Sequence, residues 1–258
     1  LYSSAASDVY KRQVLLATYV LAQLEKVLNK VVHDSIKMLV VGPVALLITG
    51  FLAFIVIGPI ALILGTGITN GVTYVFEHAG WLGGALYGLL YAPLVITGLH
   101  HMFLAVDFQL MGSSLGGTYL WPILAISNIC QGSAAFGAWI VYKRKKMVKE
   151  EGLAFTSGIS GVLGVTEPAL FGVNLPLKYP FIAAILTSSV LGAFIGAHKV
   201  LGSVGVGGWP AFISIKSEFW WIYLPATLIA TVVPAVLTIV FSRFSNQKAK
   251  KMVDTSNS

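Results

Sequence analysis

The feature that most constrains this chain is its set of long stretches without charge. No Asp, Glu, Lys or Arg occurs between Leu39 and Gly65, and further uncharged stretches cover residues 83–106, 119–142, 179–197 and 219–242. About 20 apolar residues are enough for a helix to cross the hydrocarbon core of a bilayer. Only 10 % of the residues are charged, too few to cover the surface of a soluble domain. The sequence therefore predicts an all-α, polytopic membrane protein.

The first residues do not read as part of that fold. Residues 3–13 are SSAASDVYKRQ, which resembles the in-frame translation of a transposase sequencing adapter. We expect residues 1–13 to be an adapter-derived artefact and the native sequence to start at Val14.

The next segment has helical periodicity. In residues 14–37, Leu21, Leu24 and Leu28 recur at helical spacing, and Lys26 and Lys30 fall on the other side. This pattern predicts an amphipathic helix that lies in the membrane interface, with a solvated connector helix as the alternative. We interpret residues 66–82, which are mixed and aromatic, as an interfacial link.

Basic residues gather in two places beside apolar stretches. One cluster is YKRKKMVK at residues 142–149, and the other runs from Arg243 to Lys251. The positive-inside tendency places both on the cytoplasmic side. An even number of crossings must then separate them, which residues 179–197 and 219–242 supply if the segments between them do not cross. Residues 246–258 read as a polar cytoplasmic tail.

Two apolar segments are too broken to be straight helices. Residues 153–175 contain four glycines, Pro168 and the ionisable Glu167. We expect two half-helices that meet at VTEP and form a re-entrant hairpin, because irregular backbone is tolerated at membrane depth only where protein or water shields it. Residues 202–212, GSVGVGGWPAF, suggest a second re-entrant hairpin. The GxxxG spacings at Gly84–Gly88 and Gly192–Gly196 predict close helix packing.

Polar groups inside apolar segments mark candidate sites, since they are costly there. Glu167 follows Thr166 at the predicted break, His100 and His101 are adjacent, and the amides of Asn128 and Gln131 share a helix face. Each has a structural alternative. The histidines can be satisfied between helices, Glu167 can pair with a buried donor, and the amides can join helices.

The remaining residues exclude several function classes. No GxxxxGK or HExxH motif occurs, and Cys130 is the single cysteine, so we predict no ATP hydrolysis, catalytic metal, cofactor or disulfide. Because the basic residues flank apolar spans, nucleic acid is not an expected partner. Carboxylate, imidazole and amide groups with many aromatic rings fit a neutral, hydroxyl-rich solute such as a sugar.

Four separated motifs carry a family resemblance: GLHHMFLAVDFQL, GGTYLWPILAISNICQGSA, GVTEPALFGVNL and VGVGGWP. They resemble the membrane C component of the bacterial phosphoenolpyruvate-dependent sugar phosphotransferase system, glucose–glucoside superfamily. The likeness extends over residues 14–245, and the motif sequences are most similar to those of trehalose transporters. Sucrose and β-glucoside members share part of it.

The resemblance implies a fold and a set of site residues. Residues 38–245 would be the C-terminal, sugar-binding half of the membrane domain, and the missing N-terminal half would form a homodimer interface in the full-length protein. Residues expected to bind the sugar are Glu167, His101, His100, Asn174, Gln131 and Thr166.

The implied function is disaccharide transport across the bacterial inner membrane, with membrane lipid around the chain. A phosphorylated B domain would supply the phosphoryl group, as part of a protein-N-phosphohistidine–sugar phosphotransferase of the trehalose type. This chain itself would carry no phosphorylated residue, and Cys130 would not be catalytic. A sucrose- or β-glucoside-specific member, or an ion-coupled solute carrier without phosphotransfer, is the alternative.

Overall fold

The computed structural model describes residues 18–33, 36–52, 55 and 58–256, and within these residues it contains helices and no strand. The all-α prediction is confirmed. The expected artefact at residues 1–13 lies outside the described residues. The chain divides into two compact units, one formed by residues up to Gly71 with His101–Gln109, and the other by Val72–His100 with Leu110–Ser258.

The first unit contains the predicted amphipathic helix. Residues 18–31 are helical, and the next helix, α2 (Lys37–Leu52), starts at the expected end of that segment. Leu21, Leu24 and Leu28 are half-buried while Lys26 and Lys30 are exposed, as the periodicity predicts. The first part of α3 (Gly58–Ile96) and most of α4 (His101–Gly112) complete the unit.

The expected span over Leu39–Gly65 includes residues 53–54 and 56–57, which lie outside the described residues. The helix α2 ends at Leu52 and α3 begins at Gly58, with Pro59 in its first turn. Proline fits there because the first turn of a helix needs no N–H donor. Residues 66–82, which we expected to be an interfacial link, are helical within α3, which bends at Ala79 (φ −143°, ψ 55°).

Four described helices are long and apolar enough to cross a membrane: Thr69–Ile96, Leu120–Arg144, Tyr179–Ala197 and Ser217–Phe244. The two segments that we expected to be broken are not among them. The even number of crossings between the basic clusters is therefore preserved. Val40–Leu52 is a shorter apolar helix.

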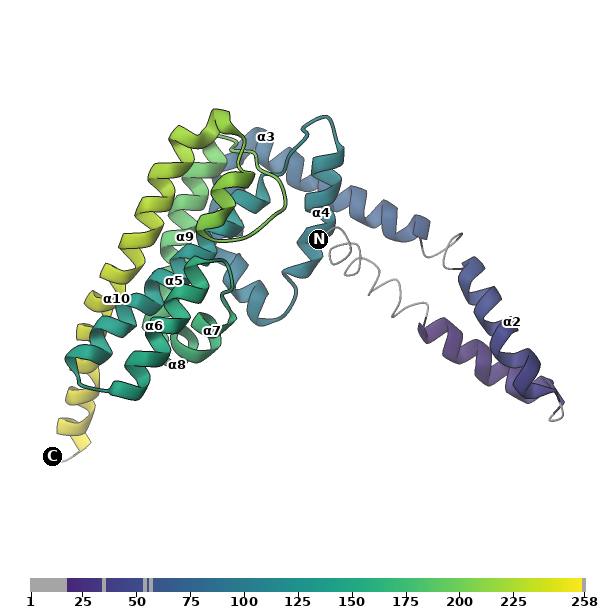
Figure 1. The fold of residues 1–258 in the computed structure, drawn as a ribbon, viewed down its shortest axis with the longest axis horizontal. Helices are drawn as coiled ribbons and strands as arrows, with labels where there is room; N and C mark the ends of the chain where they lie inside the picture. The colour runs from purple at the N-terminus through teal and green to yellow at the C-terminus, as the bar shows by residue number, and fades with distance from the viewer. Residues whose placement is uncertain (1–17, 34–35, 53–54, 56–57, 257–258) are drawn as a thin grey trace. The chain divides into compact units, whose positions relative to one another are not determined.

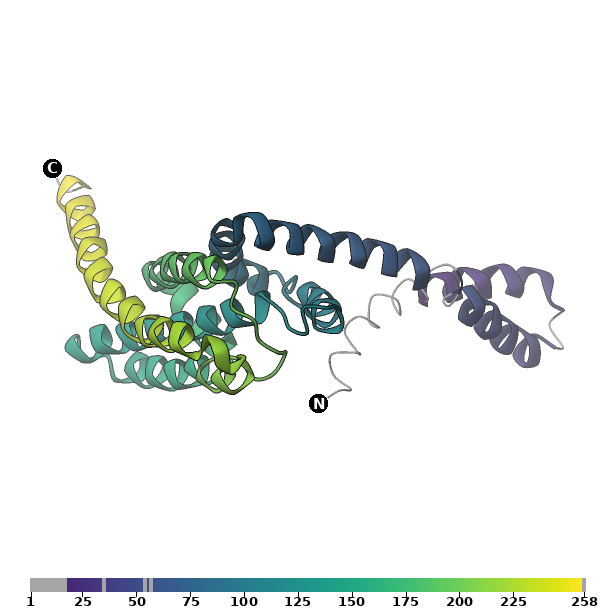
Figure 2. The same cartoon turned by 90° about the horizontal axis from the view of Figure 1, so that it is seen from above.

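The second unit is built around α5 (Leu120–Arg144), which packs against α6 (Val148–Val162), α9 (Tyr179–Ala197) and α10 (Trp220–Ser256). Figures 1 and 2 show α10 running beside α9 in both views. Of the most apolar window of α5, 83 % is buried. This helix therefore tolerates Ser127, Asn128, Gln131 and Ser133, whose side chains face protein rather than lipid.

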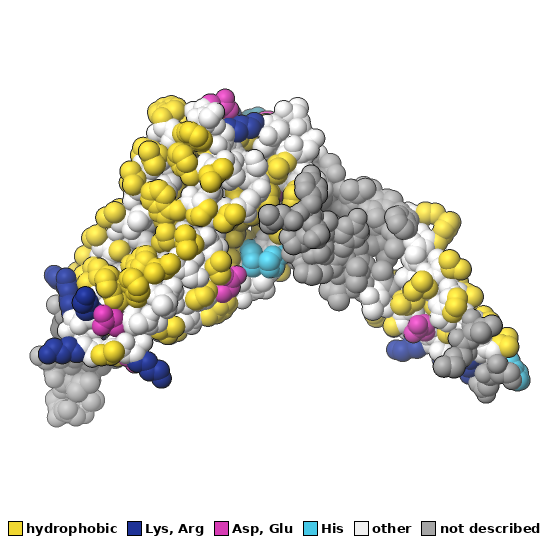
Figure 3. Space-filling view, in the orientation of Figure 1, with side chains coloured by type: hydrophobic (Ala, Val, Ile, Leu, Met, Phe, Trp, Pro, Cys, Tyr) yellow, Lys and Arg dark blue, Asp and Glu magenta, His cyan; other side chains and the backbone are white. Residues whose placement is uncertain are grey.

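The outer faces of α9 and α10 are apolar and exposed. Figure 3 shows hydrophobic side chains along the flank of this unit. The exposed large side chains of the two helices are Ile182, Leu186, Val190, Phe194, Trp220, Trp221, Leu224, Leu228, Ile229, Val232, Val236, Val240 and Phe244. A belt of this kind fits a lipid environment.

Small residues join α3 to α9. A Cβ on Gly80 or Gly84 would overlap the carbonyl oxygen of Gly196 or Gly192, and one on Gly88 would overlap that of Ser188. The prediction of close packing at the GxxxG spacings is confirmed. The two backbones touch because no side chain separates them.

A serine from α5 inserts into the backbone hydrogen bonding of α10. Pro234 lies inside α10, and the hydroxyl of Ser133 donates to the Thr231 carbonyl oxygen at 2.6 Å while accepting from the Ala235 N–H at 3.2 Å. A hydroxyl inserted between these two backbone groups satisfies both of them where a proline distorts the helix.

The close approach of α3 and α9 predicts a position-specific effect. Gly84→Ala should destabilise the protein by about 1–3 kcal/mol, because its Cβ has no room against Gly192. Gly152→Ala in α6 is the matched control, since a Cβ there would meet nothing within 4 Å and alanine favours helix. Thermal unfolding in detergent should show a lower Tm for the first variant only. Equal Tm values would contradict the packing.

Candidate functional site

The first predicted break is a hairpin of two short helical arms, residues 148–177, called the broken hairpin below. Its first arm is α6, and its second arm is α7 (Glu167–Ala169), η2 (Leu170–Asn174) and α8 (Leu175–Leu177) in succession. The arms are antiparallel, since Gly161 lies against Ala169 and Gly172 against Leu153. The predicted pair of half-helices meeting at VTEP is confirmed.

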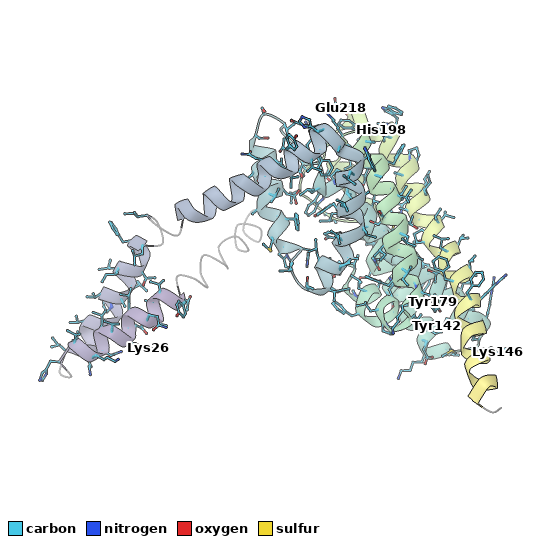
Figure 4. The ribbon with its side chains drawn as sticks, turned by 180° about the vertical axis from the view of Figure 1, so that it is seen from behind. Lys26, Tyr142, Lys146, Tyr179, His198 and Glu218 are labelled. Atoms are coloured by element: carbon cyan, nitrogen blue, oxygen red, sulfur yellow. The ribbon has the colours of Figure 1, made fainter. Side chains whose placement is uncertain are left out.

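The hairpin begins and ends at the same end of the second unit. Figure 4 shows Tyr142 of α5 and Tyr179 of α9 near Lys146, at the end opposite to His198 and Glu218. Since α5 ends before the hairpin and α9 begins after it, this arrangement is what a re-entrant segment requires.

The tip of the hairpin closes its own backbone hydrogen bonds. The N–H of Val165 donates to the Ser160 carbonyl oxygen at 2.9 Å, and that of Gly164 to Gly161 at 3.0 Å. This is the Schellman pattern, which needs a residue of positive φ where the helix ends. Gly164 has a φ of +102°, so the sequence GVLGVTEP ends α6 and starts the second arm three residues later.

The second arm is wide at its centre. Residues 170–174 form a π-helical turn, flanked by Pro168 and Pro176 in the adjoining α-helical turns. A π-helical turn shifts the following side chains around the helix axis and is frequent at functional sites. It ends on Asn174, which is completely buried.

The structure brings two of the predicted site residues, Asn174 and Gln131, into contact. The Asn174 amide nitrogen donates to the Gln131 side-chain oxygen at 2.7 Å and to its backbone oxygen at 2.9 Å. The pair joins the second arm to α5. Asn174 Oδ1 and Gln131 Nε2 are buried and have no hydrogen-bond partner in the described part of the chain, which leaves one acceptor and one donor unused beside the hairpin.

A second segment lies on the hairpin tip. Residues 202–208, called the glycine loop below, precede a 3₁₀ turn, η3 (Trp209–Ser214). A Cβ on Gly208 would overlap the carbonyl oxygen of Val162. A Cβ on Gly164 would lie 2.6 Å from the carbonyl carbon and oxygen of Gly207. The two backbones therefore touch at glycines of both segments.

Asn128 of α5 reaches the same junction. Its amide nitrogen donates to the Gly164 carbonyl oxygen at 3.4 Å, and it would lie 2.5 Å from a Cβ on Gly207. The neighbouring Trp209 indole donates to the Thr231 hydroxyl of α10 at 3.0 Å. The hairpin tip and the glycine loop are thus held to both α5 and α10.

Glu167 lies at this junction, in the first turn of the second arm. It is exposed, and its carboxylate has no hydrogen-bond or ion-pair partner within the described residues. Its neighbour Thr166 is buried. The alternative in which Glu167 pairs with a buried donor of the described chain is therefore not observed.

The two histidines fall in different units. His100 is half-buried at the turn after α3, where its ring meets Tyr91 edge-on at a centroid distance of 6.1 Å. His101 is exposed and begins α4, in the first unit. The structure therefore groups Glu167, Thr166, Asn174 and Gln131 on one hairpin and its α5 support, whereas His101 belongs to the other unit.

The chemistry of this region is hydrogen bonding. It offers the exposed carboxylate of Glu167 and, in the same unit, the buried amide groups of Asn128, Gln131 and Asn174, while Cys130 is buried within α5. No group of three or more His, Cys, Asp or Glu that could hold a metal is found among the described residues. Carboxylates and amides accept and donate to hydroxyl groups in pairs.

Sequence reasoning missed two contributors to this region. It marked residues 202–212 as a second broken segment but did not place the glycine loop on the hairpin tip. It also left out Ser157 of α6, whose buried hydroxyl has no partner among the described residues. The clustered glycines of VGVGGWP signal close backbone approach, but the approached segment cannot be read from them.

Comparisons with known proteins agree on one family. The model of the family "Phosphotransferase system, EIIC" matches residues 13–188. The chain is 49 % identical over 235 residues to the PTS system trehalose-specific EIIBC component of Bacillus subtilis (strain 168), covering 91 % of this chain and 49 % of that protein.

Two further relatives are similar. The PTS system sucrose-specific EIIBC component of Staphylococcus xylosus is 45 % identical, over 81 % of this chain and 44 % of the relative. The PTS system trehalose-specific EIIBC component of Escherichia coli (strain K12) is 40 % identical, over 91 % of this chain and 50 % of the relative. The chain thus spans about half the length of these relatives.

The glycine junction predicts that one loop glycine is essential for stability and another is not. Gly208→Ala should cost about 2–4 kcal/mol, because its φ of +66° is unfavourable for a side chain and its Cβ would overlap Val162. Gly205→Ala is the matched control, since its Cβ would make an ordinary contact at 3.5 Å with Ser214. A Tm that falls equally for both would contradict the junction.

The buried amide pair predicts a compensating double variant. Asn174→Leu alone should destabilise the protein by about 1–3 kcal/mol, because it leaves the Gln131 side-chain oxygen buried and unpaired. Adding Gln131→Leu removes the orphaned amide, so the double variant should be less destabilised than the sum of both single variants. Strictly additive costs in urea or thermal unfolding would show that the two amides do not depend on each other.

Proposed function

Because the chain belongs to the phosphotransferase system EIIC family, we propose that it binds a disaccharide, trehalose, and carries it across the bacterial inner membrane. The function resides in the second unit, where the broken hairpin exposes Glu167. Membership of an integral membrane family agrees with the four helices that are long and apolar enough to cross.

The observation that carries this proposal is the unpartnered carboxylate of Glu167 at the hairpin tip. An exposed acid with no internal partner in an apolar segment is costly unless it meets a ligand or water. Sugar hydroxyls donate to carboxylates. We propose Thr166, Gln131 and Asn174, which are buried in the same unit, as further hydrogen-bonding groups of this site. His100 and His101 remain proposed members of the same site.

The transferase role belongs to a complex. The relatives are named EIIBC components, which supports a B component as the partner that donates the phosphoryl group to the sugar. In this proposal the chain binds and orients the sugar, alternates access between the two sides, and releases it where the phosphorylated partner acts. Phosphorylation then traps the product.

The organisation of the rest of the chain follows from this role. We propose that residues 1–13 are an artefact, that 14–37 contribute an interfacial amphipathic helix, and that 38–245 form the sugar-binding half with a polar tail at 246–258. The full-length protein would dimerise through the half that precedes this segment. The chain is surrounded by membrane lipid and has no nucleic-acid partner.

Sucrose is the second candidate substrate, because a sucrose-specific relative is 45 % identical to the chain, between the two trehalose-specific relatives at 49 % and 40 %. The preference for trehalose rests on two trehalose-specific relatives and on the sequences of the family motifs. Uptake of labelled trehalose, sucrose and a β-glucoside by the full-length transporter distinguishes them. An ion-coupled carrier would transport without phosphoenolpyruvate.

The site assignment predicts a loss of transport. In the full-length transporter, Glu167→Ala should abolish trehalose uptake. Glu167→Gln should raise the apparent KM by roughly 10- to 150-fold, since a hydrogen bond to a charged group contributes about 1.5–3 kcal/mol. Uptake by cells with normal amounts of transporter in the membrane measures both.

Glu218→Gln is the matched control, because Glu218 is also exposed and lies at the far end of the unit. It should leave the KM unchanged. Wild-type trehalose uptake by the Glu167→Ala variant would overturn the site assignment, and uptake independent of phosphoenolpyruvate would overturn the phosphotransferase role.

A further inference from the structure

Basic side chains from three separate places gather at one end of the second unit. Figure 3 shows Lys and Arg concentrated there, and Figure 4 shows Lys146 at the same end. We call this group the basic end; its described members are exposed, and they are Lys143, Arg144, Lys145, Lys146, Lys149, Lys178 and Arg243.

Five cations of the basic end make no side-chain hydrogen bond or ion pair with the described residues. They are Arg144, Lys146, Lys149, Lys178 and Arg243. At the opposite end the lysines are used differently. Lys199 donates to the Glu77 carbonyl oxygen and Lys216 to that of Leu115, each at 3.0 Å.

Acidic residues do not neutralise this surface. Glu150 and Glu151 are the acids on the same connection, and both are half-buried. Glu151 accepts from the Trp139 indole at 3.3 Å, and Lys143 lies over the same indole at 5.3 Å from the ring centroid. Glu151 and Lys143 are thus both held at the Trp139 ring, whereas Arg144, Lys146 and Lys149 are exposed.

The position of these cations matches the depth of lipid headgroups. Arg144 is the last residue of one candidate span, Lys178 precedes another, and Arg243 is one residue from the end of a third. Basic residues immediately beside spans attract anionic headgroups.

Exposed apolar side chains lie among the cations. Val148 is 79 % exposed, Phe244 62 % and Met147 37 %. A surface that mixes cations with large apolar groups fits the boundary between headgroups and acyl chains, whereas a folded acidic protein would leave these groups without a counterpart.

We propose that the basic end is a binding surface for anionic phospholipids. The phosphates pair with Arg144, Lys146, Lys149, Lys178 and Arg243, and the apolar side chains enter the acyl boundary. Lipid bound there would hold the start of the broken hairpin, since Lys146 and Lys149 flank the first residue of α6. The surface is independent of the sugar site.

The test measures lipid preference in the full-length transporter. Reconstitution into mixed phosphatidylglycerol and phosphatidylcholine, with one or the other brominated, gives the relative binding constant from quenching of tryptophan fluorescence. The wild type should prefer phosphatidylglycerol at least tenfold. The triple variant Lys146→Gln/Lys149→Gln/Lys178→Gln should lose roughly 100-fold, at about fivefold per cation, and so lose the preference.

Matched substitutions separate charge from structure. Lys146→Arg/Lys149→Arg/Lys178→Arg keeps the charge and should keep the preference, and all three proteins should have the same Tm in pure phosphatidylcholine, because these side chains are exposed. The proposal is overturned if the wild type shows no preference or if the Gln variant retains it. An unchanged preference with loss of phosphoenolpyruvate-dependent uptake would instead assign the surface to the phosphoryl-donating protein.

Discussion

The structure of the second unit depends on satisfying backbone hydrogen bonds where its helices are interrupted. In an apolar environment each N–H and C=O must find a partner within the protein. At the hairpin tip, Gly164 allows α6 to close its own last turn, and Asn128 supplies a donor for the Gly164 carbonyl oxygen. In α10, the Ser133 hydroxyl bridges the Thr231 carbonyl and the Ala235 N–H beside Pro234. Each break is accompanied by a polar side chain from α5.

This requirement explains why α5 carries so many polar residues while being the most buried of the four spans. Asn128, Gln131 and Ser133 do not form one polar face toward water; they serve the glycine junction, the π-helical turn and α10 in succession. Gly132 and Gly137 allow α6 and α10 to approach closely. The helix is therefore a scaffold whose polar groups hold irregular segments in position, and rigid support of that kind is what a binding constellation needs.

Local sequence rules predicted much of the fold of this unit, whereas contacts between residues far apart in the sequence could not be predicted. Glycine, Pro168 and an acid in one apolar segment were enough to predict the broken hairpin, because each lowers the stability of a straight helix. Apolar composition did not indicate the end of α2 at Leu52 or the start of α3 at Gly58, since a continuous apolar run fits one helix or two. The pairing of Asn174 with Gln131 joins residues 43 apart in sequence, and the contact between Gly207 and Gly164 is also non-local. No periodicity records such contacts.

The distribution of charge then separates the groups that hold the fold from those left for other molecules. Lys199 and Lys216 cap backbone carbonyls of distant segments, and Glu151 accepts from Trp139, so these charges are satisfied within the protein. Glu167 and five cations of the basic end, Arg144, Lys146, Lys149, Lys178 and Arg243, have no side-chain partner within the described residues. In a chain with so few charges, an unpaired one is stable only where water, lipid or a ligand solvates it. The carboxylate at the hairpin tip and the cations at its entrance thus mark two separate contacts between this chain and its surroundings.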